Sequence, residues 1–316
     1  MQNNMMTQKD SKRILITGGA GFIGTNLCRR LINEGHSVIC LDDLSSGHLD
    51  NIKDLLDHPS FSFIEQSVTE KIDVDVDQIY HLACPASPVF YQADPLKTIR
   101  TCVDGAFQVL ELAKRTNARV LFTSTSEVYG DPLELPQRET YRGNVNINGI
   151  RACYDEGKRI AETVFCEYYR NFQTDIRIVR IFNTYGPYMH PQDGRVVSNF
   201  IIQALHKEPL TVYGDGSQTR SFCYVEDTVR ALISVLENDI FYGPVNVGNP
   251  HEITIREFAE TVLKLTGSSS EIISLPLPQD DPVRRCPDIT KIKENIGWMP
   301  EIPLEEGLKR TISYFS

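Results

Sequence analysis

The sequence has little that would place the protein in a membrane, on a nucleic acid or around a metal ion. No apolar run approaches the length needed to cross a bilayer, and the first twelve residues are polar and hold no apolar signal core. The formal net charge of −10 argues against nonspecific binding to nucleic acid or to a membrane surface. Because the chain has no Cys-x-x-Cys or His-x-His pair, we expect no metal site.

The cysteines are not arranged as a disulfide framework either. All eight are scattered singly, several of them inside apolar strand or helix patterns: Cys28, Cys40, Cys84, Cys102, Cys153, Cys166, Cys223 and Cys286. Such scattering favours reduced thiols, and we therefore expect a cytoplasmic protein. A chain of 316 residues has room for one large domain or two modest ones.

What the sequence does contain is an alternation of short apolar strands and amphipathic helices. Strand patterns occur at 13–17, 37–41, 61–64, 78–82, 119–123 and 175–181. Helical spacing of apolar residues occurs at 22–33, 96–115 and 152–172. This alternation predicts an α/β fold with a doubly wound, Rossmann-like parallel sheet.

The pattern changes after Asn183, where proline and glycine become more frequent and the loops lengthen. Later strands are predicted at 210–213 and 244–247, and later helices at 225–236, 254–266 and 304–315. We therefore predict an NAD-binding domain at 12–182 that is completed by 225–248. A smaller C-terminal substrate lobe is predicted at 183–224 and 249–316.

A glycine loop joins the first predicted strand to the first predicted helix. Gly18 and Gly21 allow a tight turn and the close approach of a pyrophosphate, and Gly24 lets helix and strand pack closely. The same glycines would also suit a simple tight turn, but their place between a strand and a helix favours a dinucleotide site. Asp42 ends the second strand, where a carboxylate accepts hydrogen bonds from ribose hydroxyls and repels a 2′-phosphate. The cofactor predicted from these residues is NAD.

Tyr154 and Lys158 are four residues apart on a predicted helix and so share one of its faces. On that face the ammonium group can favour the phenolate and lower the pKa of the tyrosine. The tyrosine then becomes a general base able to take a proton from a sugar or alcohol hydroxyl. Because the pair follows both the glycine loop and the Ser/Thr-rich run at 123–130, it predicts a hydride-transfer enzyme.

Longer runs give the chain a resemblance to a known family. These runs are His-Leu-Ala-Cys-Pro-Ala-Ser-Pro at 81–88, Thr-Ser-Thr-Ser-Glu-Val-Tyr-Gly-Asp-Pro at 123–132, Arg-Ile-Phe-Asn-Thr-Tyr-Gly-Pro at 180–187, and the runs at 193–200 and 212–222. With them, the sequence from Arg13 onward resembles the extended short-chain dehydrogenase/reductases that act on nucleotide sugars. Within that group it is most similar to the UDP-glucuronic acid decarboxylases, also called UDP-xylose synthases.

The resemblance implies an NAD-dependent carboxy-lyase that converts UDP-glucuronate to UDP-xylose through a transient 4-keto sugar and regenerates NAD. The cofactor-binding residues are expected to be Gly18, Gly21, Phe22, Ile23, Gly24, Asp42, Asp43, Ser46, Gly47, Val68, Leu82, Cys84, Thr101, Tyr154, Lys158 and Thr184. The substrate-binding residues are expected to be Asn183, Arg195, Tyr213, Gln218, Arg220 and Arg285.

The catalytic residues implied by the resemblance are Tyr154, Lys158, Thr125, Ser126, Glu127 and Arg285. Related 4,6-dehydratases carry Asp-Glu where this chain has Ser126-Glu127, and epimerases typically lack the glutamate. Arg285 belongs to the segment at 280–288 that brings an arginine to the sugar, whereas its neighbour Arg284 is expected to be only solvated.

Four positions depart from the family pattern, namely Ser67, Cys102, Arg142 and Tyr188, where aspartate, asparagine, tryptophan and arginine are usual. Three other functions stay open: a UDP-apiose/UDP-xylose synthase, a UDP-glucuronate 4-epimerase, and a non-catalytic NAD-sensing scaffold. The resemblance also implies a homodimer formed by two helices. The residues expected to provide its apolar surface are Phe107, Val109, Ala113, Val164, Phe165 and Tyr168.

Overall fold

The computed structural model describes residues 11–276 and 284–316 and is built around one seven-stranded sheet. The strand order is β11-β6-β5-β4-β1-β2-β3, and every neighbouring pair is parallel. The strands are β1 (Arg13–Thr17), β2 (Ser37–Asp42), β3 (Phe61–Glu65), β4 (Gln78–His81), β5 (Arg119–Thr125), β6 (Ile176–Ile181) and β11 (Pro244–Val247). The predicted doubly wound parallel sheet is confirmed.

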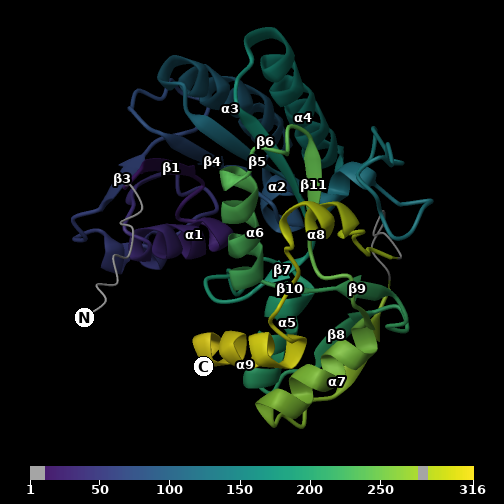
Figure 1. Ribbon diagram of the computed structural model, residues 1–316. Coiled ribbons are helices and arrows are strands. Elements are labelled where there is room, and N and C mark those ends of the chain that lie inside the picture. Colours follow the sequence, from purple (N-terminus) through teal and green to yellow (C-terminus); the bar gives the residue numbers. More distant parts are fainter. Residues whose placement is uncertain (1–10, 277–283) are drawn as a thin grey trace, which may run out of the picture.

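The alternation of side chains along each strand supplies a separate core on each face of the sheet. Ile14 and Ile16 of β1 belong to one buried cluster, and Leu15 between them belongs to the other. The helices that supply these two cores are α1 (Phe22–Asn33) and α6 (Val225–Glu237) on the first face, and α3 (Pro95–Thr116) and α4 (Ala152–Phe172) on the second. Figure 1 shows α3 and α4 side by side, far from α1 and α6.

The contact between α3 and α4 corrects the residues predicted to form a dimer surface. Five of the six are buried in the protein's own second core: Val109, Ala113, Val164, Phe165 and Tyr168. Only Phe107 is exposed, at 43%, and its ring meets that of Tyr168 edge to face. The five side chains face their own sheet because the apolar stripes of α3 and α4 must first cover it.

A smaller lobe follows β6 along the chain and lies at the bottom of Figure 1. Three two-stranded ladders stand in it: β7 (Thr184–Tyr185) with β10 (Cys223–Tyr224), β8 (Leu210–Tyr213) with β13 (Ile272–Leu275), and β9 (Thr219–Ser221) with β12 (Glu252–Thr254). Its helices are α5 (Val196–Leu205), α7 (Ile255–Thr266) and α9 (Leu304–Phe315). Two short helices complete the description, α2 (Pro88–Ala93) before α3 and α8 (Thr290–Ile296) against β11.

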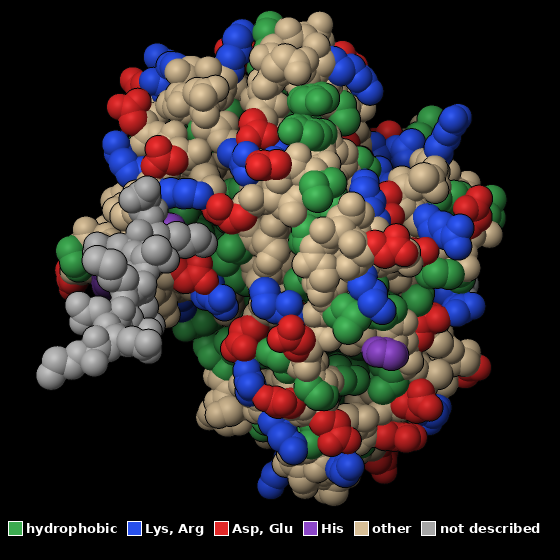
Figure 2. Space-filling model, viewed as in Figure 1, with side chains coloured by type: hydrophobic (Ala, Val, Ile, Leu, Met, Phe, Trp, Pro, Cys, Tyr) green, Lys and Arg blue, Asp and Glu red, His purple; other side chains and the backbone are tan. Residues whose placement is uncertain are grey.

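The sequence pattern did not predict α2, α5, α8 or the two-residue and three-residue strands. The long elements were predicted within about two residues, with β5 running on to Thr125. None of the described helices is long and apolar enough to cross a membrane. Figure 2 shows basic and acidic side chains interspersed over the face of the molecule in view.

Candidate active site

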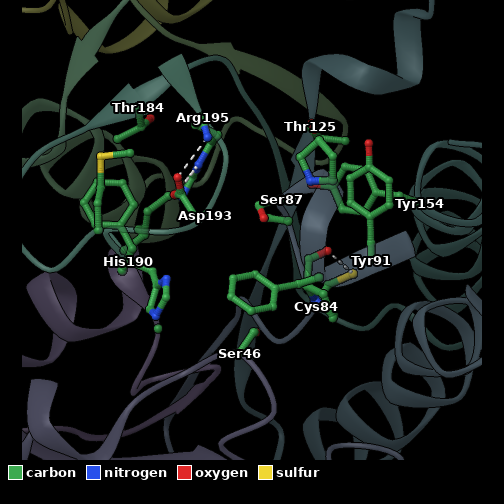
Figure 3. A pocket seen from close by; sticks show the side chains of 18 of the residues that line it. Ser46, Cys84, Ser87, Tyr91, Thr125, Tyr154, Thr184, His190, Asp193 and Arg195 are labelled. Atoms are coloured by element: carbon green, nitrogen blue, oxygen red, sulfur yellow. Dashed lines mark hydrogen bonds and ion pairs between the residues drawn. The ribbon is translucent and has the colours of Figure 1, made fainter. Parts of the chain in front are cut away.

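A pocket of about 690 Å³ lies where the carboxyl ends of the sheet strands meet the smaller lobe. Every residue predicted above to bind cofactor or substrate, or to act in catalysis, lines this pocket. Figure 3 shows Thr125, Tyr154 and Cys84 on one side of it, with Thr184 and Arg195 across from them. The described structure therefore brings the whole predicted set together, from segments up to 267 residues apart in sequence.

The glycine loop, which follows β1, forms one end of the pocket. Gly18 has φ +73°, and a Cβ at Gly24 would lie 2.1 Å from the Gly18 carbonyl oxygen, so both positions need glycine. No side chain caps the N-terminus of α1 at Gly21. The first amides of α1 therefore keep their hydrogen-bonding capacity for an anion such as a pyrophosphate.

Asp42 lies at the end of β2 and is 7% exposed. Its carboxylate accepts hydrogen bonds from the backbone N–H groups of Ala20 (3.0 Å) and Leu44 (2.9 Å), which ties it to the glycine loop. Burial raises the pKa of this carboxyl above its usual value, against the effect of these two bonds. A side chain at Gly47 would lie 2.8 Å from the carboxylate oxygens, so glycine there keeps the acid open to the pocket.

Tyr154 and Lys158 of α4 both line the pocket, as their spacing predicts, but the electrostatic part of that prediction is wrong. Burial, followed by the nearby Cys84, raises the pKa of Tyr154 well above its ordinary value. The hydrogen bond with Thr125 acts in the opposite direction. The Lys158 ammonium nitrogen lies 6.0 Å from the centre of the tyrosine ring and donates to the Thr123 carbonyl oxygen at 2.9 Å. Desolvation, the largest cause, therefore decides the direction of this pKa shift.

Glu127 lies in the short helix η3 (Ser126–Tyr129), which follows β5. Two guanidinium groups hold its carboxylate. Its Oε2 accepts from Arg151 at 2.5 Å and from Arg285 at 2.7 Å. Burial alone would raise the pKa of Glu127, but the charges of Arg285, Arg151 and Arg220 lower it below its usual value. Glu127 is therefore an ionised carboxylate at neutral pH, and Ser126 beside it is buried.

The two adjacent arginines have different surroundings. Arg285 is 7% exposed and faces Glu127, whereas the Arg284 side chain is 49% exposed and pairs with Glu252. The solvated position expected for Arg284 is confirmed. The first part of the predicted arginine segment, at 280–283, lies outside the described residues.

Comparison with known proteins places these features in a family. A model described as "NAD dependent epimerase/dehydratase family" matches residues 14–248. The chain belongs to this family. The UDP-glucuronic acid decarboxylase 5 of Arabidopsis thaliana is 55% identical over 309 residues, which cover 98% of this chain and 90% of the relative.

Solved structures of the epimerase/dehydratase family have the same architecture. A UDP-glucose 4-epimerase of Thermotoga maritima, solved with UDP-glucose, superposes with a TM-score of 0.87 at 30% identity and covers 96% of this chain and 98% of its own. A dTDP-glucose 4,6-dehydratase of Streptomyces venezuelae, solved with NAD, gives a TM-score of 0.87 at 28% identity and covers 96% of both chains.

The four departures from the family pattern have different places in the structure. Ser67 lines the pocket and hydrogen-bonds Thr69 at 2.9 Å, and Tyr188 lines it with its ring under the Arg29 guanidinium. Arg142 is exposed and outside the pocket lining, so it does not shape the site. Cys102 lies buried beneath the lining residue Cys84, within hydrogen-bonding distance of its thiol.

The residues that sequence reasoning missed include two that line the pocket, Arg151 and Tyr91, and a buried neighbour that does not line it, Asp155. Arg151 holds Glu127, and its position one turn before Tyr154 on the same helix face was the signal that could have found it. The ring of Tyr91 stacks on that of Tyr154, with centroids 5.0 Å apart, and no spacing in the sequence indicates this. Asp155 is buried beside Glu127, and burial together with that charge raises its pKa to about 7.

Proposed function

We propose that the protein decarboxylates UDP-glucuronate to UDP-xylose and regenerates its NAD in each turnover. The observation that carries this proposal is the contact between two groups of residues in one pocket. Tyr154 and Thr125 form a pair suited to oxidise a sugar hydroxyl, and the cluster of Glu127 with Arg151 and Arg285 lies beside it. Relatives that are 53% and 55% identical to the chain over 311 and 309 aligned residues carry the name of this activity.

The charge of the cluster suits an anionic sugar. Arg151, Arg220 and Arg285 all act on Glu127, so three guanidinium groups surround one carboxylate. Such a group of arginines attracts a second carboxylate, and an arginine binds it through two parallel hydrogen bonds. The negative charge of the whole protein gives no such attraction, so these few cations must select the substrate.

The cofactor end of the pocket fits a dinucleotide. The uncapped N-terminus of α1 and the glycine loop would hold the pyrophosphate, and Asp42 would accept hydrogen bonds from the ribose. Asp43, Ser46, Gly47, Val68, Leu82, Cys84, Thr101 and Thr184 complete the proposed lining. When bound, NAD⁺ supplies a reversible hydride acceptor at the sugar C4 and a positive charge beside Tyr154.

Tyr154 takes the proton of the C4 hydroxyl in this proposal. Its pKa is raised by burial in the pocket, so the phenolate forms only when positive charge enters beside it. Thr125 donates to or accepts from the same oxygen and keeps it in place during the proton transfer. Lys158, held by the Thr123 carbonyl, fixes the orientation of this end of α4.

Oxidation at C4 places the sugar carboxylate β to a ketone, so carbon dioxide leaves and an enolate remains. Arg285 stabilises the carboxylate and then the enolate, because a guanidinium stays charged throughout. Glu127 keeps Arg285 and Arg151 oriented toward the sugar, and Ser126 helps to position the ring. The carbon that lost carbon dioxide is then reprotonated. The 4-keto group is reduced by return of the hydride that was taken from C4 in the first step.

The remaining cations and amides of the smaller lobe are proposed to hold the UDP moiety. Arg220 is 6% exposed and lines the pocket, as does Arg195, which pairs with Asp193. An arginine in this position suits the diphosphate oxygens. Asn183, Tyr213 and Gln218 line the same end.

A single assay tests the function against its alternatives. The purified protein is incubated with UDP-glucuronate and NAD⁺, and carbon dioxide and the sugar products are followed by NMR. We expect carbon dioxide and UDP-xylose in equal amounts. UDP-galacturonate without carbon dioxide would indicate a 4-epimerase, UDP-apiose a branched-sugar synthase, and NAD binding without turnover a scaffold.

We also propose a homodimer formed through α3 and α4, and the two-part division of the chain given above. The burial described for these helices moves the proposed contact to their exposed apolar side chains. On α3 these are Leu96, Ile99 and Phe107, and on α4 they are Ile160 and Phe172.

A further inference from the structure

Two thiols meet at the floor of the pocket. Cys84 follows β4 and lines the pocket, and Cys102 on α3 is 1% exposed. Their sulfur atoms are 3.2 Å apart, so one thiol donates a hydrogen bond to the other. Cys102 is one of the residues in which this chain departs from its family, so the second thiol is a property of this protein.

The two thiols have opposite protonation preferences. Burial opposes the charged form of Cys84, but the hydrogen bond from Cys102 and the charge of Lys158 lower its pKa. The hydrogen bond to Cys84, followed by burial, raises the pKa of Cys102 well above its ordinary value. Cys84 is therefore the thiol of the pair that ionises more readily to the reactive thiolate, and Cys102 is the one that holds its proton more tightly.

The pair also touches the helix that carries the proposed base. A Cβ added to Gly157 would lie 3.1 Å from the Cys102 sulfur, so this thiol packs directly against α4 between Tyr154 and Lys158. Cys153, the nearest other cysteine on α4, donates to the Tyr91 carbonyl oxygen instead. The geometry thus joins Cys84 to one partner only.

We propose that Cys84 and Cys102 form a redox modification site, at which hydrogen peroxide converts the two thiols to a disulfide. The Cys84 thiolate attacks one peroxide oxygen, the O–O bond breaks, and the departing oxygen leaves as water after taking a proton. The sulfenic acid formed on Cys84 is then attacked by the Cys102 sulfur, which releases a second water. Two thiols are oxidised, and one peroxide is reduced to two waters.

The disulfide would change the active site through the two residues at the floor of the pocket. It removes the thiolate whose charge raises the pKa of Tyr154, and it ties the segment after β4 to α3. Peroxide reaches Cys84 from the pocket, because Cys102 is covered. A dinucleotide that fills the cofactor end therefore protects the pair.

The test maps the cysteines directly. The reduced protein is treated with hydrogen peroxide, free thiols are alkylated with N-ethylmaleimide before unfolding, and the digest is analysed by mass spectrometry. We expect a peptide pair linked through Cys84 and Cys102, lighter by two hydrogens and separated again by dithiothreitol. Saturating NAD, at about ten times its Kd, should slow its formation on the order of tenfold.

Two variants complete the test. Cys102→Ser should leave Cys84 trapped as a sulfenic acid, which dimedone labels, and Cys166→Ser on the outer part of α4 should form the linked peptide as fast as the parent. Circular dichroism checks that both are folded. The proposal would be overturned if Cys84 were still free to be alkylated after peroxide treatment, or if it were linked to Cys153 instead. It would also be overturned if NAD left the rate of disulfide formation unchanged. Because the readout is a peptide mass, it does not depend on the decarboxylation assay.

Discussion

Tyr154 lies in a pocket that disfavours the phenolate, and this would keep the proposed base protonated. The ring is 5% exposed and stacks on Tyr91, and its hydroxyl shares a hydrogen bond with Thr125. Its pKa is raised mainly because burial removes water from the oxygen. If Tyr154 is the base proposed above, positive charge brought by a bound ligand would favour the phenolate and so assist proton transfer.

Tyr154→Phe should lower turnover by a factor on the order of 10²–10⁴, because the proton acceptor is lost while the ring stays stacked on Tyr91. NAD affinity measured by calorimetry should change little. Turnover in the purified variant is compared with that of Tyr141→Phe, a tyrosine outside the pocket lining. Equal turnover of Tyr154→Phe and the parent would refute the assignment.

Asp155 predicts a distinctive dependence of stability on pH. Burial, followed by the charge of Glu127, raises its pKa from 3.8 to about 7, although Arg151 and Arg285 act in the opposite direction. The folded chain then binds this proton more tightly than the unfolded chain, so its contribution to the unfolding free energy falls as pH rises from about 4 to about 7 and is constant above. The decrease is up to about 4 kcal/mol.

Asp155→Asn removes this titration, so the variant should equal the parent near pH 4 and be more stable at pH 8. Urea unfolding of both proteins at pH 4.5, 6 and 8 measures the difference. A difference that is constant with pH would show that Asp155 is ionised in the folded protein at all three values.

Arg285 and Arg284 form a matched pair for testing the substrate end. Arg285→Ala should still form NADH or the 4-keto sugar from UDP-glucuronate, but make UDP-xylose more slowly, because the carboxylate and enolate lose their partner. Arg284→Ala removes only an exposed ion pair with Glu252, worth at most about 1 kcal/mol, and should keep turnover within about twofold. Stopped-flow absorbance and NMR follow the two stages. Normal UDP-xylose formation by Arg285→Ala would exclude it from the site.

The strands and helices differ in how well the sequence reveals them. β1 and β2 are buried on both faces and α3 and α4 carry long apolar stripes, so local pattern is enough to predict them. The ladders of the smaller lobe have two to four residues per strand and depend on partners distant in sequence. Apart from β8, which was predicted at 210–213, these strands are too short for periodicity to give a signal.

The same distinction holds for the candidate site. Residues at the ends of strands, such as Asp42 and Thr125, follow from the rule that parallel strands present their carboxyl ends at one edge. Glu127 and Arg285 were assigned to the site from the family resemblance, but their pairing across 158 residues of sequence was not predicted. The pKa of Tyr154 was mispredicted because helix spacing reports the distance to Lys158 but not the loss of water around the phenol.

The end of β2 should decide between NAD and NADP. Asp42→Asn keeps an acceptor oxygen for one of the two N–H groups of Ala20 and Leu44, which donate to different carboxylate oxygens, and removes the charge that repels a 2′-phosphate. The affinity for NAD should fall and the affinity for NADP should rise, which narrows the preference of the protein for NAD over NADP. Calorimetry with both cofactors measures this. A parent protein that binds the two equally would contradict the role of Asp42.

The assembly of the whole molecule should depend on the exposed face of α3. Phe107→Asp should convert a dimer to a monomer of 35.8 kDa, because a carboxylate on an apolar contact stays unpaired. Ile240→Asp is the control, since this residue is also exposed, at 57%, and follows α6 on another part of the surface. Light scattering at micromolar concentration gives both masses. A monomeric parent would remove the basis for the dimer.

Because β11 is an edge strand from late in the sequence, it affects the order in which parts of the fold can form during synthesis. Among the described strands it pairs with β6 alone, and the side chain of its Asn246 joins the Tyr129 hydroxyl to the Gln137 and Asp288 carbonyl oxygens. On the ribosome, β6 emerges long before this edge strand, and Arg285 emerges later still. A nascent chain can therefore build the cofactor loop early. Arg285 can reach Glu127 only after nearly all of the message has been translated, so a chain released early lacks this ion pair of the pocket.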